Sequence, residues 1–501
     1  MGSDGNAYAW GLNNYGQLGD GTRTSRNTPV MVRTPDRKTY PDLPEDFTYV
    51  QVSAGDNHSL ALGSDGYVYT WGNNKYGQLG NNTKGGYSSV PVRVRDPGSP
   101  TDANKGLKAV QISAGANHSL VIDSDGYVYA WGWGAMGQLG NNTTSYDGNP
   151  FPLRVRDPAN PDDTSKGLKA IQVSGGWQHS LAVGRDGYAY AWGLNNYGQL
   201  GNNTSNGSKV PVRVLDPASP TDANKGLKAI QVSGGGDHSL AIGEDGNTWS
   251  WGRNDHGELG NNGRNTNTAI PGPVQYPKGE STVKAVQVNT GLFYSLAIGA
   301  DGNVWAWGQN NNGQLGNNTT NNRTIPIKVF TSAQSTSSSG PWLNAVQISA
   351  GTYHSLAIGT DGNAKAWGNN SNGQLGDNTT NTRLVPVPVV FNLTPVITGV
   401  RFDQSAVSGL THGNDNSVTV LTPIHVPGTV TVSVDYTLGG AGSTLTDTSL
   451  KYTYLPAGVL PRAGGEGILL ALAAGMTGMG GVLASRRHRR ETRQLLQASH
   501  E

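Results

Sequence analysis

Five histidines recur at one position of a repeated pattern, and they are the first residues to suggest metal or proton chemistry. Each precedes Ser-Leu, and Tyr294 takes their place in a sixth copy. Equivalent positions of stacked repeats are dispersed, so they cannot converge on one ion. Each also begins an apolar segment, where polar side chains are normally hydrogen-bonded. We therefore predict structural histidines, hydrogen-bonded between repeats, at these positions: His58, His118, His179, His238 and His354.

No other constellation in the chain points to catalysis. There is no G-x-S-x-G or H-E-x-x-H motif and no phosphate loop, and type I′ turns explain the repeated Asp-Gly pairs without calcium. The 501 residues include no cysteine, which excludes thiol catalysis, cysteine-held metals and disulfides. Charged residues make up 14% and the net charge is +1, too little for a nucleic-acid-binding field. We predict no enzymatic activity, no cofactor, no metal and no nucleic acid partner.

A ten-residue pattern organises the elements that carry these residues. It begins with Trp-Gly and ends with Gly-Gln-Leu-Gly or, once, Gly-Glu-Leu-Gly. A fixed period of about 60 residues indicates one supersecondary unit repeated many times. The seven copies begin at Trp10, Trp71, Trp131, Trp192, Trp251, Trp307 and Trp367.

Four short segments between successive copies have the composition of β-strands. In one unit they are residues 90–94, 110–113, 118–122 and 127–131, separated by Pro, Gly and Asp-Gly punctuation. Asp-Gly between two such runs is a strong hairpin signal. Four short strands per repeat without a helical period are typical of one blade of a β-propeller, so the predicted class is all-β.

Three recurring sequences, AGxxHSLAI, DGxVYAWG and NxxGQLG, resemble the regulator of chromosome condensation family of seven-bladed propellers. The resemblance covers residues 1–391 and implies a seven-bladed β-propeller. Two strand types occur seven times, but the other two occur six times. Because propellers avoid unpaired edges, we expect the first blade to be truncated by about two strands and the coding sequence to start upstream of Met1.

The loops of the predicted propeller differ between repeats, and function is expected there. Consecutive connections of an antiparallel meander alternate between the two ends of a blade. The AGxxH and WGxNxxGQLG loops are therefore predicted to share one face. Exposed loop aromatics dominate many binding surfaces, although they can also pack on their own loops. The predicted ligand-binding residues of this face are Trp133, Met136, Trp177, Phe293, Tyr353 and His256.

The Asp-Gly hairpins are predicted to share the opposite face with three nearly identical inserts. These inserts begin at Arg95, Arg156 and Leu215 and are rich in Pro, Asp, Asn and Gly. Such composition predicts ordered surface turns. They could be binding loops, but the sequence favours insertions spread by duplication of repeats.

The period stops after Phe391, and residues 392–456 are predicted to form a second domain. Thr and Val alternate around Pro423 and Pro427, and a Tyr-rich strand follows. This pattern predicts a small β-sandwich. Residues 422–434 resemble the TPxHxxGTVxVxV segment of immunoglobulin-like IPT/TIG domains.

Residues 457–501 have the composition of a surface anchor. The apolar run 468–484 is about 25 Å long as a helix, enough for a thin transmembrane span, and an arginine-rich tail follows. The arginines would stay in the cytoplasm, which leaves the upstream chain outside. The segment resembles a Gram-positive LPXTG sorting signal, with alanine in place of threonine. A variant sortase would cleave it, or the helix would remain as an anchor. The motif residues are Leu460, Pro461, Arg462, Ala463 and Gly464.

These features together predict a bacterial protein anchored in the cell wall or membrane and displayed at the cell surface. Its propeller is expected to be a non-catalytic binding or adhesion module for an extracellular protein or glycan. Two alternatives follow from resemblance: guanine-nucleotide exchange, which the family name suggests, and inhibition of an extracellular enzyme, as in exported propeller inhibitors of β-lactamases.

Overall fold

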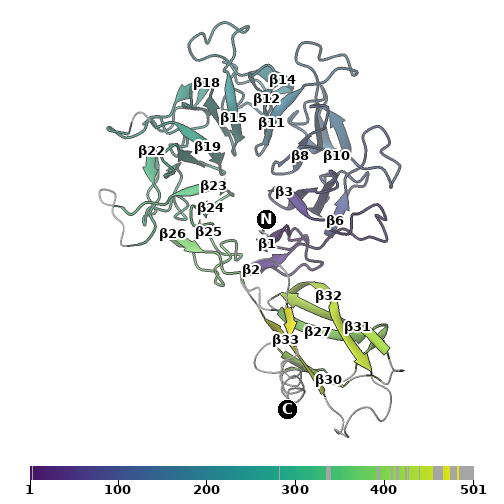
Figure 1. The fold of residues 1–501 in the computed structure, drawn as a ribbon. Coiled ribbons are helices and arrows are strands. Elements are labelled where there is room, and N and C mark those ends of the chain that lie inside the picture. Colours follow the sequence, from purple (N-terminus) through teal and green to yellow (C-terminus); the bar gives the residue numbers. More distant parts are fainter. Residues whose placement is uncertain are drawn as a thin grey trace. The chain divides into compact units, whose positions relative to one another are not determined.

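The computed structural model describes most of the chain (Figure 1). Two compact units make it up, Met1–Phe391 and Asn392–Glu501. Every regular element of the described residues is a β-strand, which confirms the predicted all-β class. The residues outside the description are 3, 281–282, 334–339, 392–394, 408–409, 413–416, 422, 424–425, 427, 439–440, 455–466, 474–481 and 485–501.

The first unit is a ring of antiparallel sheets, as Figure 1 shows. Among the described residues, six sheets have four strands in chain order. Their innermost strands are β3 (Tyr49–Ala54), β7 (Gln111–Ala114), β11 (Ala170–Gly175), β15 (Ala229–Gly234), β19 (Ala285–Thr290) and β23 (Ala345–Ala350). The second strands are β4 (His58–Gly63), β8 (His118–Ile122), β12 (His179–Gly184), β16 (His238–Gly243), β20 (Tyr294–Gly299) and β24 (His354–Gly359).

The two outer strands of each sheet carry the Trp-Gly pair and the segment that follows its loop. The third strands are β5 (Val68–Asn73), β9 (Val128–Gly134), β13 (Ala189–Gly193), β17 (Thr248–Gly252), β21 (Val304–Gly308) and β25 (Ala364–Gly368). The outermost strands are β6 (Tyr87–Arg93), β10 (Ser145–Arg154), β14 (Ser208–Arg213), β18 (Thr268–Pro273), β22 (Arg323–Lys328) and β26 (Arg383–Pro388). These four-strand repeats confirm the predicted blades.

A seventh sheet contains two strands, β1 (Tyr8–Gly11) and β2 (Arg26–Met31). It contacts the sixth four-stranded blade, since Trp10 Nε1 donates to Gln374 O at 3.0 Å and Asn378 N donates to Asn27 O at 2.9 Å. Two strands are what the count of strand types predicted for this blade. The expected upstream start remains a prediction.

The Asp-Gly hairpins use a different turn from the one predicted. At the β12–β13 hairpin, Gly187 N donates to Gly184 O at 2.9 Å, and Gly187 has a φ of 80°. The preceding Asp186 is not among the residues with positive φ, whereas a type I′ turn requires positive φ at both central residues. A type I turn followed by a left-handed glycine fits these angles, so the type I′ prediction was wrong.

Large tryptophans join neighbouring blades through the core. Trp251 is fully buried beside Leu181, Leu200 and Val214 of the preceding blade. Its indole Nε1 donates to Gln199 O at 2.8 Å, so the ring is satisfied as well as packed. Burial of one such side chain stabilises the fold by a few kcal/mol, on the order of 3. The repeated tryptophan is therefore structural, as predicted.

Glutamine side chains extend this connection to the innermost strands. Gln172 Nε2 donates to Val232 O at 2.9 Å, and Gln172 Oε1 accepts from Val232 N at 2.8 Å. The Gln172 side-chain amide thus makes the two hydrogen bonds to Val232 that the backbone of a paired strand would make. The same bridge joins Gln51 to Ile112 and Gln287 to Ile348. Adjacent blades are held in register by hydrogen bonds as well as by apolar packing.

The second unit contains two four-stranded sheets. One consists of β28 (Ser405–Ala406), β27 (Pro395–Phe402), β31 (Gly428–Leu438) and β32 (Ala441–Tyr454). The other consists of β29 (Thr411–His412), β30 (Ser417–Leu421), β33 (Gly467–Ala473) and β34 (Val482–Ala484). Val418 and Val420 of the second sheet share a buried cluster with Phe402, Val432 and Val434 of the first. The sheets therefore pack around one core, and the IPT/TIG resemblance remains a prediction.

Much of the predicted anchor lies outside the described residues. This holds for the motif 460–464, for the predicted boundary at 456 and for residues 474–481 and 485–501. The described ends of the predicted span, β33 and β34, are strands, where the sequence predicted a helix. Among the described residues, no helix has the length and apolarity that crossing a membrane requires.

Candidate functional site

The loop face of the propeller is built from two loops per blade, the AGxxH loop and the WGxNxxGQLG loop. Backbone hydrogen bonds of 2.9 Å join them: Trp133 N donates to Asn117 O, and Arg253 N donates to Asp237 O. Gln309 N donates to Phe293 O in the same way. The two loops of a blade therefore lie side by side, which confirms that they share a face.

The repeated residues of this face hold the blades together. Gln138 Oε1 accepts from Met136 N at 2.9 Å, which closes the turn. Its backbone carbonyl accepts both Trp192 Nε1 at 2.9 Å and Ser180 Oγ at 2.8 Å from the next blade. The Gly-Gln-Leu-Gly segment is therefore a structural turn that receives two side chains of its neighbour.

Four of the five repeated histidines, His58, His118, His179 and His238, extend the same network, which confirms their predicted structural role. His179 Nε2 lies 2.9 Å from Ser239 Oγ of the next blade, and that hydroxyl donates to Gln199 O at 2.9 Å. The serine proton is thus engaged, so His179 Nε2 carries the hydrogen and donates it. Burial lowers the pKa of His179 to about 4. Its Nδ1 has no hydrogen-bond partner, so an N–H formed there by protonation would have no acceptor.

Equivalent pairs occur at three other junctions, at 2.9 to 3.0 Å: His58 with Ser119, His118 with Ser180, and His238 with Ser295. Tyr294 keeps the pattern, because its hydroxyl lies 3.0 Å from Ser355 Oγ. Within the described parts of the chain, no group of three or more His, Cys, Asp or Glu residues could hold a metal ion. Neutral, buried histidines of this kind join blades and are not placed to exchange protons with a substrate.

Trp177 is the most exposed of the predicted contact residues. It is 37% exposed, in the loop after β11. Its Nε1 donates to Asp56 Oδ2 at 3.2 Å, although Asp56 belongs to the blade two positions earlier. The intervening blade connects them, since Asp56 N donates to Ala116 O and Ala116 N donates to Gly176 O, each at 3.3 Å. Trp177 therefore spans the inner rim of the loop face.

Trp133 lies at the end of β9 and Met136 in the loop that follows it, and both are half-buried. The Trp133 ring lies 6.0 Å from the ring of Tyr76 in the preceding repeat, measured between centroids. Lys75 Nζ lies 5.0 Å from the same tyrosine centroid. These side chains form a small aromatic and basic group at the junction of two blades.

Phe293 and His256 are brought together at another junction, around an arginine that the sequence analysis missed. Their ring centroids are 5.5 Å apart. The Arg253 guanidinium lies 4.8 Å from the Phe293 centroid and 4.9 Å from the Tyr197 centroid, so it stands between two rings. It also pairs with Asp237 at 3.2 Å.

Three acidic side chains complete the group around Arg253. Burial raises the pKa of Asp237, although the Arg253 charge opposes this shift. Glu258 is fully buried: its Oε2 accepts from His256 N at 2.7 Å, and its Oε1 has no partner. Burial raises the pKa of Glu258 to about 7. Asp255 Oδ2 accepts from Arg253 Nε at 2.7 Å at the edge of the group.

Of the six predicted residues, only Phe293 and His256 are in direct ring contact. Tyr353 is half-buried in the last loop, where its carbonyl accepts from Asn369 N at 2.9 Å. Asp237, Arg253 and Glu258 could have been found in the sequence, because every other repeat has an uncharged residue at their positions. The loop face is therefore uneven in charge as well as in aromatic content.

Comparison with protein families gives matches over most of the chain. The RCC1-like domain matches residues 1–340, and the regulator of chromosome condensation (RCC1) repeat matches residues 345–374 and 361–401. The ultraviolet-B receptor UVR8 of Arabidopsis thaliana is 31% identical over 342 residues, which is 68% of this chain and 69% of the receptor. The E3 ubiquitin-protein ligase HERC2 of Homo sapiens is 30% identical over 366 residues, 73% of this chain but 7% of the ligase.

Solved structures show the same fold at lower identity. Human WBSCR16 superposes with a TM-score of 0.60 at 22% identity, covering 78% of this chain and 95% of that protein. Yeast RCC1 (Prp20), solved bound to Kap60, gives a TM-score of 0.62 at 22% identity, over 78% of this chain and 86% of that one. These similarities place the first unit among propellers of this type.

Proposed function

Because this chain belongs to the RCC1-like family of β-propeller proteins, we propose that it is a non-catalytic module that binds a partner through the loop face of its propeller. The fold alone does not specify a ligand, since function resides in sites carried by a scaffold. The repeated histidines, tryptophans and glutamines are occupied in joining blades. Specific binding of a partner therefore depends on the residues that differ from one repeat to another.

The observation that carries the proposal is the group around Arg253. An arginine between two aromatic rings, paired with a carboxylate on each side, is held in a fixed orientation by four neighbours: Tyr197, Phe293, Asp237 and Asp255. Arginine and aromatic side chains are enriched among residues that dominate binding energy. The half-buried state of Arg253 leaves part of the guanidinium for a partner. Trp177 and Trp133 add aromatic surface along the same face.

We further propose that this face works outside the cell. The motif at 460–464, the apolar run and the arginine-rich tail support an anchored protein with its propeller displayed on a Gram-positive surface. Its partner would then be an extracellular protein or glycan, and a sortase would be a second partner at the motif. Protease treatment of intact cells that express the chain tests this proposal. Removal of the propeller from the cells supports display, and complete protection contradicts it.

Binding is tested with the purified full chain on a glycan array and against extracellular protein extracts. Arg253→Ala, Phe293→Ala and Trp177→Ala should each weaken capture of the partner about tenfold or more. Tyr146→Ala is the matched control, because Tyr146 is 74% exposed on the outer strand β10. Capture of nothing, or equal capture by all four variants, would contradict the proposal. Nucleotide-exchange and β-lactamase assays on the same protein test the alternatives, and we expect no effect in either.

A further inference from the structure

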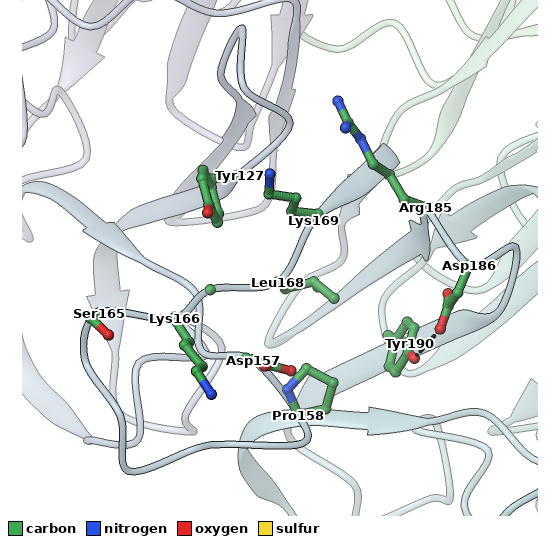
Figure 2. Close-up of a pocket in the computed structure, with 11 residues that line it drawn as sticks. Tyr127, Asp157, Pro158, Ser165, Lys166, Leu168, Lys169, Arg185, Asp186 and Tyr190 are labelled. Carbon is green, nitrogen blue, oxygen red and sulfur yellow. Dashed lines mark hydrogen bonds between the residues drawn. The ribbon is translucent and has the colours of Figure 1, made fainter.

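A hollow of about 390 Å³ lies among the inserts and hairpins (Figure 2). It is bounded by the insert that follows β10 and by the hairpin between β12 and β13. Three basic side chains line it, Lys166, Lys169 and Arg185, together with Asp157 and Asp186. Figure 2 shows Lys169 and Arg185 extending in the same direction from one side of the hollow, while Lys166 lines the opposite side.

The backbone fixes Lys169 and Arg185 as neighbours. Arg185 N donates to Lys169 O at 3.0 Å, and Lys169 is bridged to Tyr127 of the preceding blade. The Arg185 guanidinium lies against Gly126: a side chain at position 126 would place its Cβ 2.7 Å from Arg185 Nη2. The Lys169 Nζ lies 4.5 Å from the Tyr127 ring centroid. Both positive charges thus lie against neighbouring residues, Gly126 and Tyr127, of the hairpin between β8 and β9.

The nearby carboxylates are engaged by their own loops. Asp186 accepts from Tyr188 N at 3.2 Å and from Tyr190 Oη at 2.7 Å. Asp157 accepts from Ala159 N and from Asn160 Nδ2, both at 3.0 Å. None of the ion pairs found among the described residues involves Lys166, Lys169 or Arg185. Neither Lys169 nor Arg185 therefore forms an ion pair within the described chain.

The neighbouring blades show that this arrangement is specific to one junction. At the next one, Lys228 and Glu244 take the two positions and form an ion pair at 3.8 Å. At the previous one, Lys108 and Ser124 take them, beside a smaller hollow of about 250 Å³. Adjacent like charges are unfavourable. The same scaffold places an opposite charge or a neutral residue beside the lysine at these two junctions, but a second cation at this one.

We propose that Lys169 and Arg185 form a binding site for an oxyanion, a phosphate, sulfate or carboxylate group of a small ligand. A guanidinium offers a planar pair of N–H donors to such a group, and an ammonium adds a mobile charge. A bound oxyanion would also relieve the repulsion between the two cations. The site lies on the hairpin side of the blades and uses none of the residues assigned to the loop face, so it is independent of the proposed function.

The experiment titrates the full chain with inorganic phosphate, sulfate and glucuronate at constant ionic strength, with chloride as the balancing anion. Phosphate binding is followed by the width of its phosphorus NMR line, and the other two anions by calorimetry. The variants are Arg185→Ser, which reproduces the residue of the previous junction, and Arg185→Glu, which reproduces that of the next. Arg185→Lys preserves the charge, and Lys209→Ser removes an exposed lysine on β14 as a control.

We expect saturable binding of at least one of the three anions, weakened about tenfold by Arg185→Ser and abolished by Arg185→Glu, whose carboxylate would pair with Lys169. Lys209→Ser should change the affinity by less than about threefold, whereas Arg185→Lys, which keeps the charge but loses the planar pair of donors, should weaken binding by less than Arg185→Ser does. The anion that binds most tightly identifies the chemical source of the ligand. The proposal is overturned if no anion binds saturably, or if Arg185→Ser and Arg185→Glu bind as the unaltered protein does.

Discussion

Acid should lower the free energy of unfolding of the propeller because of its buried histidines. The size of this loss can be calculated for one of them, His179. His179 donates from Nε2 to Ser239, and its Nδ1 is buried without an acceptor. Protonation would place a charge and an unsatisfied N–H in the core. The folded protein therefore binds this proton less readily than the unfolded chain. The stability that depends on a histidine with a lowered pKa is fully present when the pH is above the pKa of that histidine in the unfolded chain. It is lost as the pH falls below that pKa.

The magnitude follows from two pKa values, 6.5 for the exposed side chain and about 4 for buried His179. At about pH 5 nearly all unfolded chains carry the proton, whereas only about one folded molecule in ten does, so the loss relative to about pH 7.5 is about 2 kcal/mol. Burial lowers the pKa of His58 to about 4, and of His118 and His238 to about 3. Each of these histidines should contribute a similar loss.

The assay is urea unfolding at the two pH values, followed by the fluorescence of the buried tryptophans. The substitution is His179→Tyr, because Tyr294 already occupies the equivalent position and keeps the contact with serine. The variant should lose about 2 kcal/mol less than the unaltered protein between pH 7.5 and 5. His179→Gln, which cannot titrate either, gives the same comparison if tyrosine does not fit. An acid loss equal to that of the unaltered protein in both variants would refute the reasoning.

Three further predictions concern other buried groups. Glu258→Gln should raise the free energy of unfolding by about 1 to 3 kcal/mol at about pH 8, and the gain should disappear below about pH 4.5, because burial raises the pKa of Glu258 to about 7 and stability is lost as the carboxyl ionises. A gain that persists in acid would contradict this. Gln172→Leu should cost about 1 to 3 kcal/mol, because it leaves the N–H and C=O of Val232 unpaired; an unchanged urea midpoint would contradict it. Arg93→Met should cost about 2 to 4 kcal/mol in the same assay, because Arg93 is buried between Asp42 and three tyrosines, and Asp42→Asn should cost less because Asp42 is half exposed.

The period of the sequence predicted the blades because every copy repeats the same short apolar segments, separated by Pro, Gly and Asp-Gly at the same places. Residues 118–122 and 127–131 were predicted as strands, and β8 and β9 confirm them to within a few residues. The turn between such strands was predicted less well. Asp-Gly fits both a type I′ turn and a type I turn followed by a left-handed glycine, and only the dihedral angles separate the two.

The candidate site was predicted less completely than the fold. The sequence analysis selected His256 and Phe293 as separate loop residues, but their contact with each other and with Arg253 depends on how adjacent blades meet. Trp177 was selected for its aromatic ring, and its bond to Asp56 crosses 121 positions of the chain. The local pattern that predicts a strand does not predict contacts of this kind between blades.

The sequence by itself determined the repeat, the four strands of each blade and the structural role of the histidines, because period and alternation are local properties of the chain. The tertiary structure decided which loops meet at each junction. Packing of consecutive blades brings Arg253 between Tyr197 and Phe293. Strand pairing within one blade sets Arg185 beside Lys169, where the next blade sets Glu244 beside Lys228. The physical reason is that identical blades create identical positions, and the charge of the side chains that meet there differs from one junction to the next.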